Sequence, residues 1–194
     1  MKKLAVITVV AMMMASCGGG SGGGNIIMKS ANESVNFDLR GTGNVTVDWG
    51  DGKRRTHEIS NTKIKFAHVY SNESARTITI TGNNITFMDC SVNGLTSLDV
   101  SRCHTLNHLD CSRNQLTSLD LSKNTSLSFV DCCGNGLTGS ALNDLFRTLN
   151  SNAGDKIIYA FHNPGQSDCD ASIATNKGWA ASISAIDAPL PPTR

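Results

Sequence analysis

The sequence predicts an α+β fold, in which a short solenoid of stacked parallel strands lies between an antiparallel β module and a helical cap. Three observations favour this class. One phrase recurs with a period of 21 residues through the middle of the chain, polarity alternates at period two before it, and apolar residues recur at helical spacing after it. The repetition weighs most, because a regular internal repeat defines the architecture directly.

The repeats read ITFMDCSVNGLTSLDVSRCHT, LNHLDCSRNQLTSLDLSKNTS and LSFVDCCGNGL, beginning at Ile85, Leu106 and Leu127. Each opens with the pattern L-x-x-L-x-L-x-x-N-x-L. This pattern resembles the leucine-rich-repeat family, in its short bacterial, internalin-like version. The resemblance implies a short parallel strand in each repeat, on the concave face of a solenoid spanning residues 85–137.

Strand alternation sends one cysteine of each repeat inward. Because free cysteine packs as a small hydrophobe, we expect a buried column rather than chemistry. Its members are Cys90, Cys111 and Cys132. We expect a matching ladder of asparagines to bond the turn backbone. Its members are Asn93, Asn114 and Asn135.

The segment before the repeats predicts an antiparallel β module over residues 25–84. Its stretches VTVDWGDGKRRTHEIS and KIKFAHVYSNESARTITITG alternate in polarity around a Gly-Asp-Gly turn signal. The segment resembles a polycystic-kidney-disease-type (PKD) domain at Trp49-Gly50-Asp51-Gly52 and at His68 and Tyr70. That resemblance implies an abbreviated immunoglobulin-like sandwich in which the WGDG turn is structural.

Residues 138–180 predict the C-terminal cap, made of a helix, a strand and a second helix. TGSALNDLFRTLNSN has apolar residues at helical spacing, with Ser140 as the expected cap. KIIYAFHNPG fits the repeat template with Asn163 in the asparagine position, so we expect a fourth parallel strand. The second helix, CDASIATNKGW, is expected to close the stack with Ile173 and Trp179 buried.

The amino terminus has the layout of an export signal: MKK, then an apolar stretch, then ASC. A small-residue run ending in cysteine resembles the lipobox of bacterial lipoproteins, which implies that Cys17 is acylated. A Gly/Ser tether follows Cys17, and a proline-rich tail ends the chain. The expected boundaries are a signal peptide at 1–16, a tether at 17–24 and a disordered tail at 181–194.

The expected binding surface consists of side chains that alternate with the inward cysteines on the concave face. They form an aromatic edge beside an aspartate stripe. The candidate residues are Phe87, Asp89, His108, Asp110, Phe129, Asp131, Tyr159 and Phe161. Carboxylates roughly 4.8 Å apart repel by roughly 0.9 kcal/mol in water, so such a stripe tolerates few members. It is interpreted either as an acidic docking surface or weak calcium seat, or as a set of backbone caps.

Function follows by analogy. The chain from about Gly41 to Trp179 resembles small bacterial envelope lipoproteins with a PKD-like module and internalin-like repeats, which implies recognition rather than catalysis. We expect a monomer, lipid-anchored in the cell envelope at the outer membrane, that holds a protein or polysaccharide, as in adhesion. The 17 Lys+Arg balance 16 Asp+Glu, so no nucleic-acid partner is expected. The alternative is a passive envelope scaffold or inhibitor without a ligand of its own.

The sequence favours neither a metal site nor a catalytic site. Cys103, His104, His108 and Cys111 have metal-like spacing, but the repeat points them in different directions, so no metal or cofactor is expected. A Cys133–Cys169 disulfide stays open, as does the choice between surface and periplasm. No Ser-His-Asp order or phosphate loop is visible, so we do not expect an enzyme.

Overall fold

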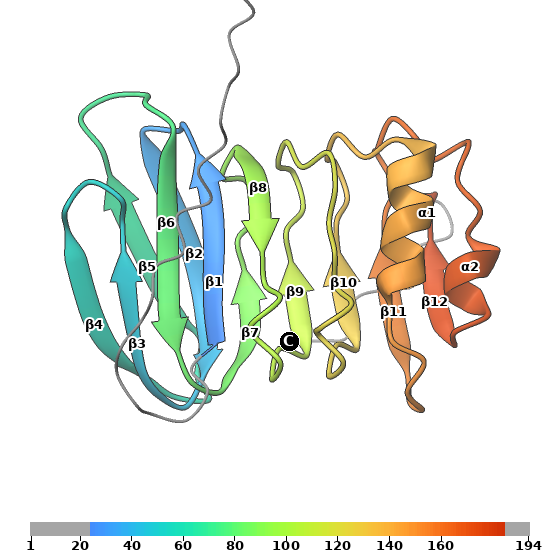
Figure 1. Ribbon diagram of the computed structural model, residues 1–194, viewed down its shortest axis with the longest axis horizontal. Helices are drawn as coiled ribbons and strands as arrows, with labels where there is room; N and C mark the ends of the chain where they lie inside the picture. Colours follow the sequence, from blue (N-terminus) through green and yellow to red (C-terminus); the bar gives the residue numbers. More distant parts are fainter. Residues whose placement is uncertain (1–23, 185–194) are drawn as a thin grey trace, which may run out of the picture.

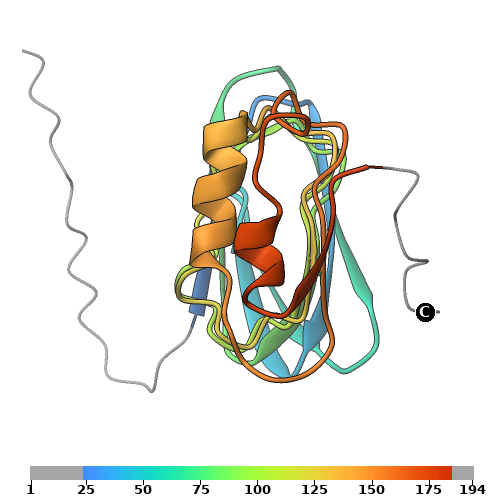
Figure 2. The same ribbon diagram turned by 90° about the vertical axis from the view of Figure 1, so that its right-hand side faces the viewer.

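The computed structural model describes residues 24–184. The signal peptide, Cys17, the tether up to residue 23 and residues 185–194 lie outside the described residues. Two β-sheets face each other across one hydrophobic core (Figures 1 and 2).

The five-stranded sheet is antiparallel throughout, in the order β4-β3-β6-β1-β8. Its strands are β1 (Gly24–Ser30), β3 (Gly43–Asp48), β4 (Arg54–Ile59), β6 (Arg76–Gly82) and β8 (Leu95–Asp99). The pattern of burial alternates along β3 and β6, so one face of this sheet lies on the core.

The seven-stranded sheet is mixed, in the order β12-β11-β10-β9-β7-β2-β5. Its strands are β2 (Ser34–Gly41), β5 (Ile64–Val69), β7 (Ile85–Asp89), β9 (His108–Asp110), β10 (Phe129–Asp131), β11 (Lys156–Tyr159) and β12 (Trp179–Ser182). The strands β5, β2 and β7 pair antiparallel, whereas β7, β9, β10, β11 and β12 pair parallel.

Two helices complete the chain, α1 (Gly139–Thr148) and α2 (Ser172–Thr175). The helix α1 lies across the core from β11 and buries Leu142, Leu145 and Phe146 (Figures 1 and 2). Its cap is Thr138 rather than the expected Ser140, since the Thr138 hydroxyl accepts from the Ala141 amide.

The predicted fold class is therefore wrong. The described chain is mostly β, in one antiparallel and one mixed sheet, and residues 24–184 contain neither a separate parallel solenoid nor a helical cap. The amino-terminal strands are not a cap either, because β2 bonds directly to β7 and β1 bonds directly to β8. At the other end the last strand is β12, which reaches Ser182, and α2 ends at Thr175 before it begins.

The local repeat pattern nevertheless places its side chains as expected. Cys90, Cys111 and Cys132 are fully buried. The asparagines bond from one repeat to the next: the Asn114 side-chain oxygen accepts from the amides of Asn93 and Leu95, both at 3.0 Å. Asn163 plays the same part at the last step.

The WGDG turn is structural, as the resemblance implied. Trp49 is buried and stacks on His68, with ring centroids 4.8 Å apart. His68 Nε2 lies 2.8 Å from a carboxylate oxygen of Asp51, and this hydrogen bond lowers the pKa of Asp51. The Tyr70 hydroxyl donates to the Trp49 carbonyl, and burial raises the pKa of Tyr70 to about 12.

Candidate functional site

The candidate site is the face of the seven-stranded sheet that points away from the core, called here the outer sheet face. Inward residues such as Met88, Leu109 and Val130 are fully buried, so their neighbours along each strand point outward. The parallel register places Phe87, His108 and Phe129 in one row, the aromatic row. The next row contains Asp89, Asp110 and Asp131, followed by Tyr159 on β11.

The aromatic row is a continuous stack. The rings of Phe87 and His108 lie 4.4 Å apart, and those of His108 and Phe129 lie 4.1 Å apart and nearly parallel. Tyr159 meets Phe129 edge to face at 5.7 Å, and Phe161 meets Tyr159 at 6.1 Å. All five predicted rings are therefore brought together on one face.

Two of these rings are not exposed as the prediction required. Phe87 is 6% exposed and Tyr159 is 5% exposed. The guanidinium of Arg40 lies 4.1 Å and the ammonium of Lys63 lies 4.8 Å from the centre of the Phe87 ring. Pairing of β2 with β7 places Arg40 opposite Phe87, so a strand distant in sequence covers this ring. The rings that keep partial exposure are His108, Phe129 and Phe161.

The aspartate row gains a fourth member that the sequence reasoning missed. Asp38 on β2 stands opposite Asp89, so the row is Asp38, Asp89, Asp110 and Asp131. Lys63 lies 3.8 Å from Asp38 at the end of the row. No repeat marks Asp38, and only the pairing of β2 with β7 could have indicated it.

Each repeat aspartate also caps its own turn. The amides of Ser91, Ser112 and Cys133 donate to Asp89, Asp110 and Asp131 respectively. Burial raises the pKa of Asp110, and the carboxylates of Asp131 and Asp89 raise it further. The capping interpretation therefore holds for one oxygen of each repeat aspartate, and all three aspartates stay partly exposed on the outer sheet face.

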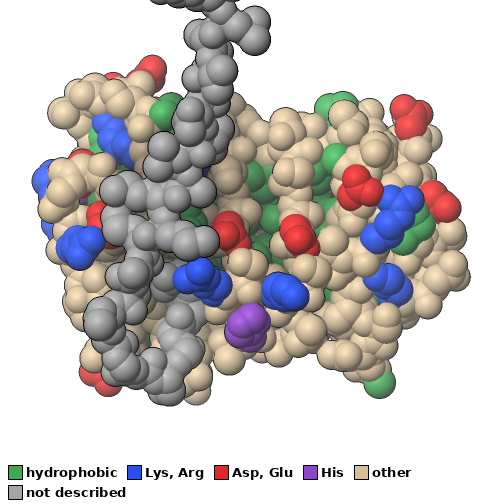
Figure 3. Space-filling model, in the orientation of Figure 1, with side chains coloured by type: hydrophobic (Ala, Val, Ile, Leu, Met, Phe, Trp, Pro, Cys, Tyr) green, Lys and Arg blue, Asp and Glu red, His purple; other side chains and the backbone are tan. Residues whose placement is uncertain are grey.

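The second halves of the repeats, LTSLDV and LTSLDL, contain no aromatic residue. Figure 3 shows the face that belongs to the five-stranded sheet and α1, and its acidic and basic side chains are interspersed. Asp99 and Asp120 lie in the second halves of the repeats and cap Ser101 and Ser122 in the same way.

Five of the six cysteines in residues 24–184 donate to backbone carbonyls, the Cys133 thiol bonds to the Asp131 carboxylate, and none is paired with another cysteine. The Sγ atoms of Cys90 and Cys111 donate to the carbonyls of Asp110 and Asp131, both at 3.4 Å, and burial raises the pKa of both thiols well above the usual range. All six cysteines in residues 24–184 are free, so the Cys133–Cys169 disulfide that the sequence left open does not form.

Within the described residues, no group of three or more His, Cys, Asp or Glu side chains is placed to hold a metal ion. Cys103 donates instead to the Ile85 carbonyl. None of the helices in residues 24–184 has the length and apolarity that crossing a membrane requires.

Comparisons with known proteins give one distant likeness. No protein-family model and no curated protein matches the chain. A solved structure described as the functional domain of InlJ from Listeria monocytogenes, which includes a cysteine ladder, is similar at 37% identity with a TM-score of 0.36. The match covers 46% of this chain, and it spans only 18% of that one.

Proposed function

We propose that the protein is a lipid-anchored binding protein of the bacterial cell envelope, which holds a protein or polysaccharide on the outer sheet face. One observation carries the proposal: a stack of rings runs beside a row of carboxylates across neighbouring strands. Partly exposed aromatic and acidic groups in adjacent rows offer both apolar contact and hydrogen-bond acceptors. Anchorage rests on the lipobox-like sequence that ends at Cys17.

The binding experiment compares two matched pairs of aspartates. The first pair, Asp89→Asn and Asp110→Asn, lies on the outer sheet face. The second pair, Asp99→Asn and Asp120→Asn, lies in the second halves of the repeats and has the same capping bond. Asparagine keeps the capping oxygen and removes the charge, so both double variants are expected to fold.

The chain, with Cys17→Ser and without its signal peptide, is screened against host-matrix proteins and polysaccharides. We expect the first pair to weaken the ligand found at least tenfold and the second pair to leave it unchanged. Equal effects of the two pairs would contradict the proposed face. If the intact chain retains nothing from the panel, the passive scaffold is the better interpretation.

The anchor and its orientation need a separate measurement. Labelled palmitate is expected to enter the full chain, and Cys17→Ser is expected to abolish that labelling. Protease treatment of intact cells, with lysed cells as the control, then separates surface display from a periplasmic position. A Cys17→Ser chain that still carries the label would contradict the anchor.

A further inference from the structure

The third repeat departs from the other two at the turn that follows its strand. The turns read Ser91-Val92-Asn93, Ser112-Arg113-Asn114 and Cys133-Gly134-Asn135. The middle residue is left-handed in all three, with φ of 58°, 53° and 63°. The backbone is therefore alike, and only the side chains differ: the third turn has a thiol instead of a hydroxyl and no side chain at its middle residue.

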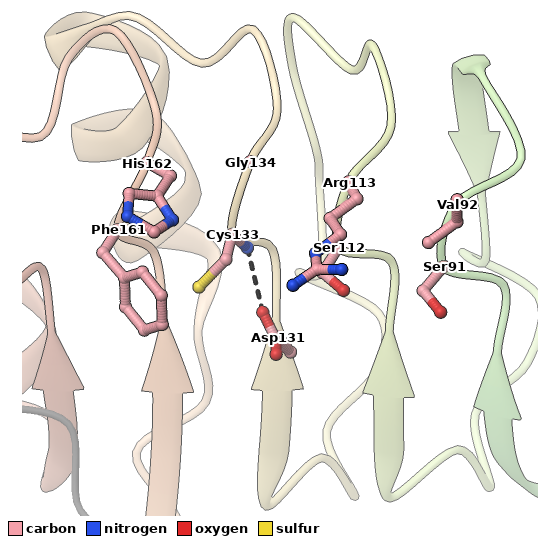
Figure 4. A pocket seen from close by; sticks show the side chains of 9 residues that line it. All are labelled: Ser91, Val92, Ser112, Arg113, Asp131, Cys133, Gly134, Phe161 and His162. Atoms are coloured by element: carbon pink, nitrogen blue, oxygen red, sulfur yellow. Dashed lines mark hydrogen bonds between the residues drawn. The ribbon is translucent and has the colours of Figure 1, made fainter. Parts of the chain in front are cut away.

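A hollow of about 240 Å³ lies at this edge of the outer sheet face, and Gly134 is one of the residues that line it (Figure 4). A Cβ built on Gly134 would meet the Cα and Cγ atoms of Arg113, both at 3.5 Å. A larger residue at position 134 would therefore lie along Arg113 and occupy this space. In Figure 4, Arg113 lies on one side of Gly134, and Phe161 and His162 lie on the other.

The change from serine to cysteine leaves more acceptor capacity on Asp131. In the two earlier repeats, Ser91 and Ser112 donate their hydroxyls to the preceding aspartates at 2.7 Å. Cys133 offers only a weak thiol donor in that position. The Asp131 carboxylate accepts the Cys133 amide at 2.9 Å and a side-chain hydrogen bond from the Cys133 thiol, which is a weaker donor than the serine hydroxyls.

The remaining walls supply a donor and an aromatic surface. Arg113 is exposed, and within the described residues no ion pair holds its guanidinium. Phe161 is partly exposed, and its ring meets His162 edge to face at 5.0 Å. The hollow thus combines a carboxylate acceptor, a guanidinium donor and the face of a ring.

Charge decides between classes of ligand. A cation that binds Asp131 is repelled by Arg113, and an anion that binds Arg113 is repelled by Asp131. A neutral ligand with neighbouring hydroxyls uses both groups, because each hydroxyl both donates and accepts. Such a ligand also needs an apolar side to lie on Phe161, which the C–H face of a pyranose ring provides.

We propose that this hollow is a subsite for one neutral sugar ring of a polysaccharide. Asp131 and Arg113 bond neighbouring hydroxyls, and Phe161 packs against the ring. This inference deepens the function proposed above and rests on it, since it makes the ligand of the outer sheet face a glycan.

The test uses the full chain with Cys17→Ser and ligand-observed NMR titration. The probes are the methyl glycosides of glucose, galactose, mannose and N-acetylglucosamine. Methyl glucuronide and arginine methyl ester are the charged comparisons. We expect at least one neutral glycoside to bind, and both charged probes to bind at least tenfold more weakly than it does.

The central variant is Gly134→Asn, because asparagine tolerates the left-handed backbone while it fills the hollow. We expect it to weaken glycoside binding at least tenfold, as Asp131→Asn and Phe161→Leu should also do. The matched control is Asp120→Asn, which removes the charge of a capping aspartate in the second half of a repeat, away from the hollow. Thermal unfolding of each variant verifies the fold. If Gly134→Asn does not fold, Phe161→Leu is the variant that tests the subsite.

Binding of no neutral glycoside, or tighter binding of a charged probe, would overturn the sugar subsite. So would glycoside binding that survives Gly134→Asn and Phe161→Leu in folded protein. The wider function fails separately: a panel ligand that is indifferent to Asp89→Asn and Asp110→Asn contradicts the outer sheet face, whatever the glycosides do.

Discussion

The ammonium group of Lys156 donates a hydrogen bond of 2.8 Å to the main-chain oxygen of Lys177, inside the molecule. Lys156 is only 4% exposed, and its Nζ also donates to the carbonyls of Asn150 and Asn152. One side chain on β11 thus donates hydrogen bonds to both the segment that follows α1 and the segment that follows α2. The strand β12 begins at Trp179, two residues after Lys177, so the contact lies beside the last strand of the sheet.

Lys156→Met is therefore expected to lower the free energy of unfolding by about 3 kcal/mol, since it leaves buried carbonyls without their charged donor. Urea unfolding followed by circular dichroism measures the change. The control is Lys123→Met, an exposed lysine of the repeats, which should change stability by no more than about 0.5 kcal/mol. Equal midpoints for the two variants would show that the buried ammonium does not hold this end.

The asparagine ladder predicts an order of effects. The Asn114 side chain takes part in five hydrogen bonds, all to the backbone of its own and the preceding repeat. Asn124, in the second half of the same repeat, donates two, and its buried side-chain oxygen has no partner within residues 24–184. We expect Asn114→Ala to cost about 4 kcal/mol and Asn124→Ala about 2 kcal/mol in chemical denaturation. The reverse order would contradict the bond assignments.

The inward positions could be predicted from the sequence because a repeat fixes a period. For this reason Cys111 is buried and Asn114 bonds the turn backbone as expected, whereas their bonds to neighbouring repeats were not part of the prediction. The cover over Phe87 could not be predicted, because it depends on how β2 pairs with β7 across a long stretch of chain. A sequence pattern predicts on which face of a strand a side chain lies, but it does not predict which distant strand pairs beside it.

The same limit explains the wrong fold class. Alternation predicted the amino-terminal strands, yet it does not state whether they form their own sandwich or extend the sheets of the repeats. For the candidate site, the aspartates of the repeats were found and Asp38 was not. The hollow at Gly134 was visible in the sequence only as a glycine where its counterparts are Val92 and Arg113.

Val92 predicts a stabilising substitution. It is a β-branched residue held at φ of 58°, a conformation that costs an L residue about 1–2 kcal/mol, and its side chain is 64% exposed. Val92→Asn should raise the free energy of unfolding by about 1 kcal/mol, or the melting temperature by about 3 °C. The control is the other strongly exposed valine, Val69 on the edge strand β5, where Val69→Asn should give no gain. Similar shifts in melting temperature for the two variants would contradict the assignment of the gain to backbone strain at Val92.

Asp110 predicts a dependence on pH. Burial raises its pKa above the ordinary value of 3.8, so the folded protein binds this proton more tightly than the unfolded chain. Stability due to this group therefore falls as pH rises from 3.8 through the raised pKa. Asp110→Asn should be more stable than the parent at neutral pH, and the advantage should shrink below pH 3.8. Thermal melts across pH measure this, with the exposed Asp120→Asn as the control. An advantage independent of pH would contradict the assignment.

The cysteines predict a slow pattern of thiol reaction. Cys90, Cys111 and Cys132 are fully buried, and burial raises the pKa of each thiol, so the reactive thiolate is scarce and out of reach. Cys169 is the cysteine with partial exposure among residues 24–184. With Cys17→Ser, we expect the folded chain to show one thiol that reacts within minutes with a disulfide reagent, and six after denaturation. Cys169→Ser should remove the fast phase and leave the slow ones. A fast phase that persists in that variant would mean that the reagent reaches the buried cysteines, and these cysteines would then be reactive in the folded protein.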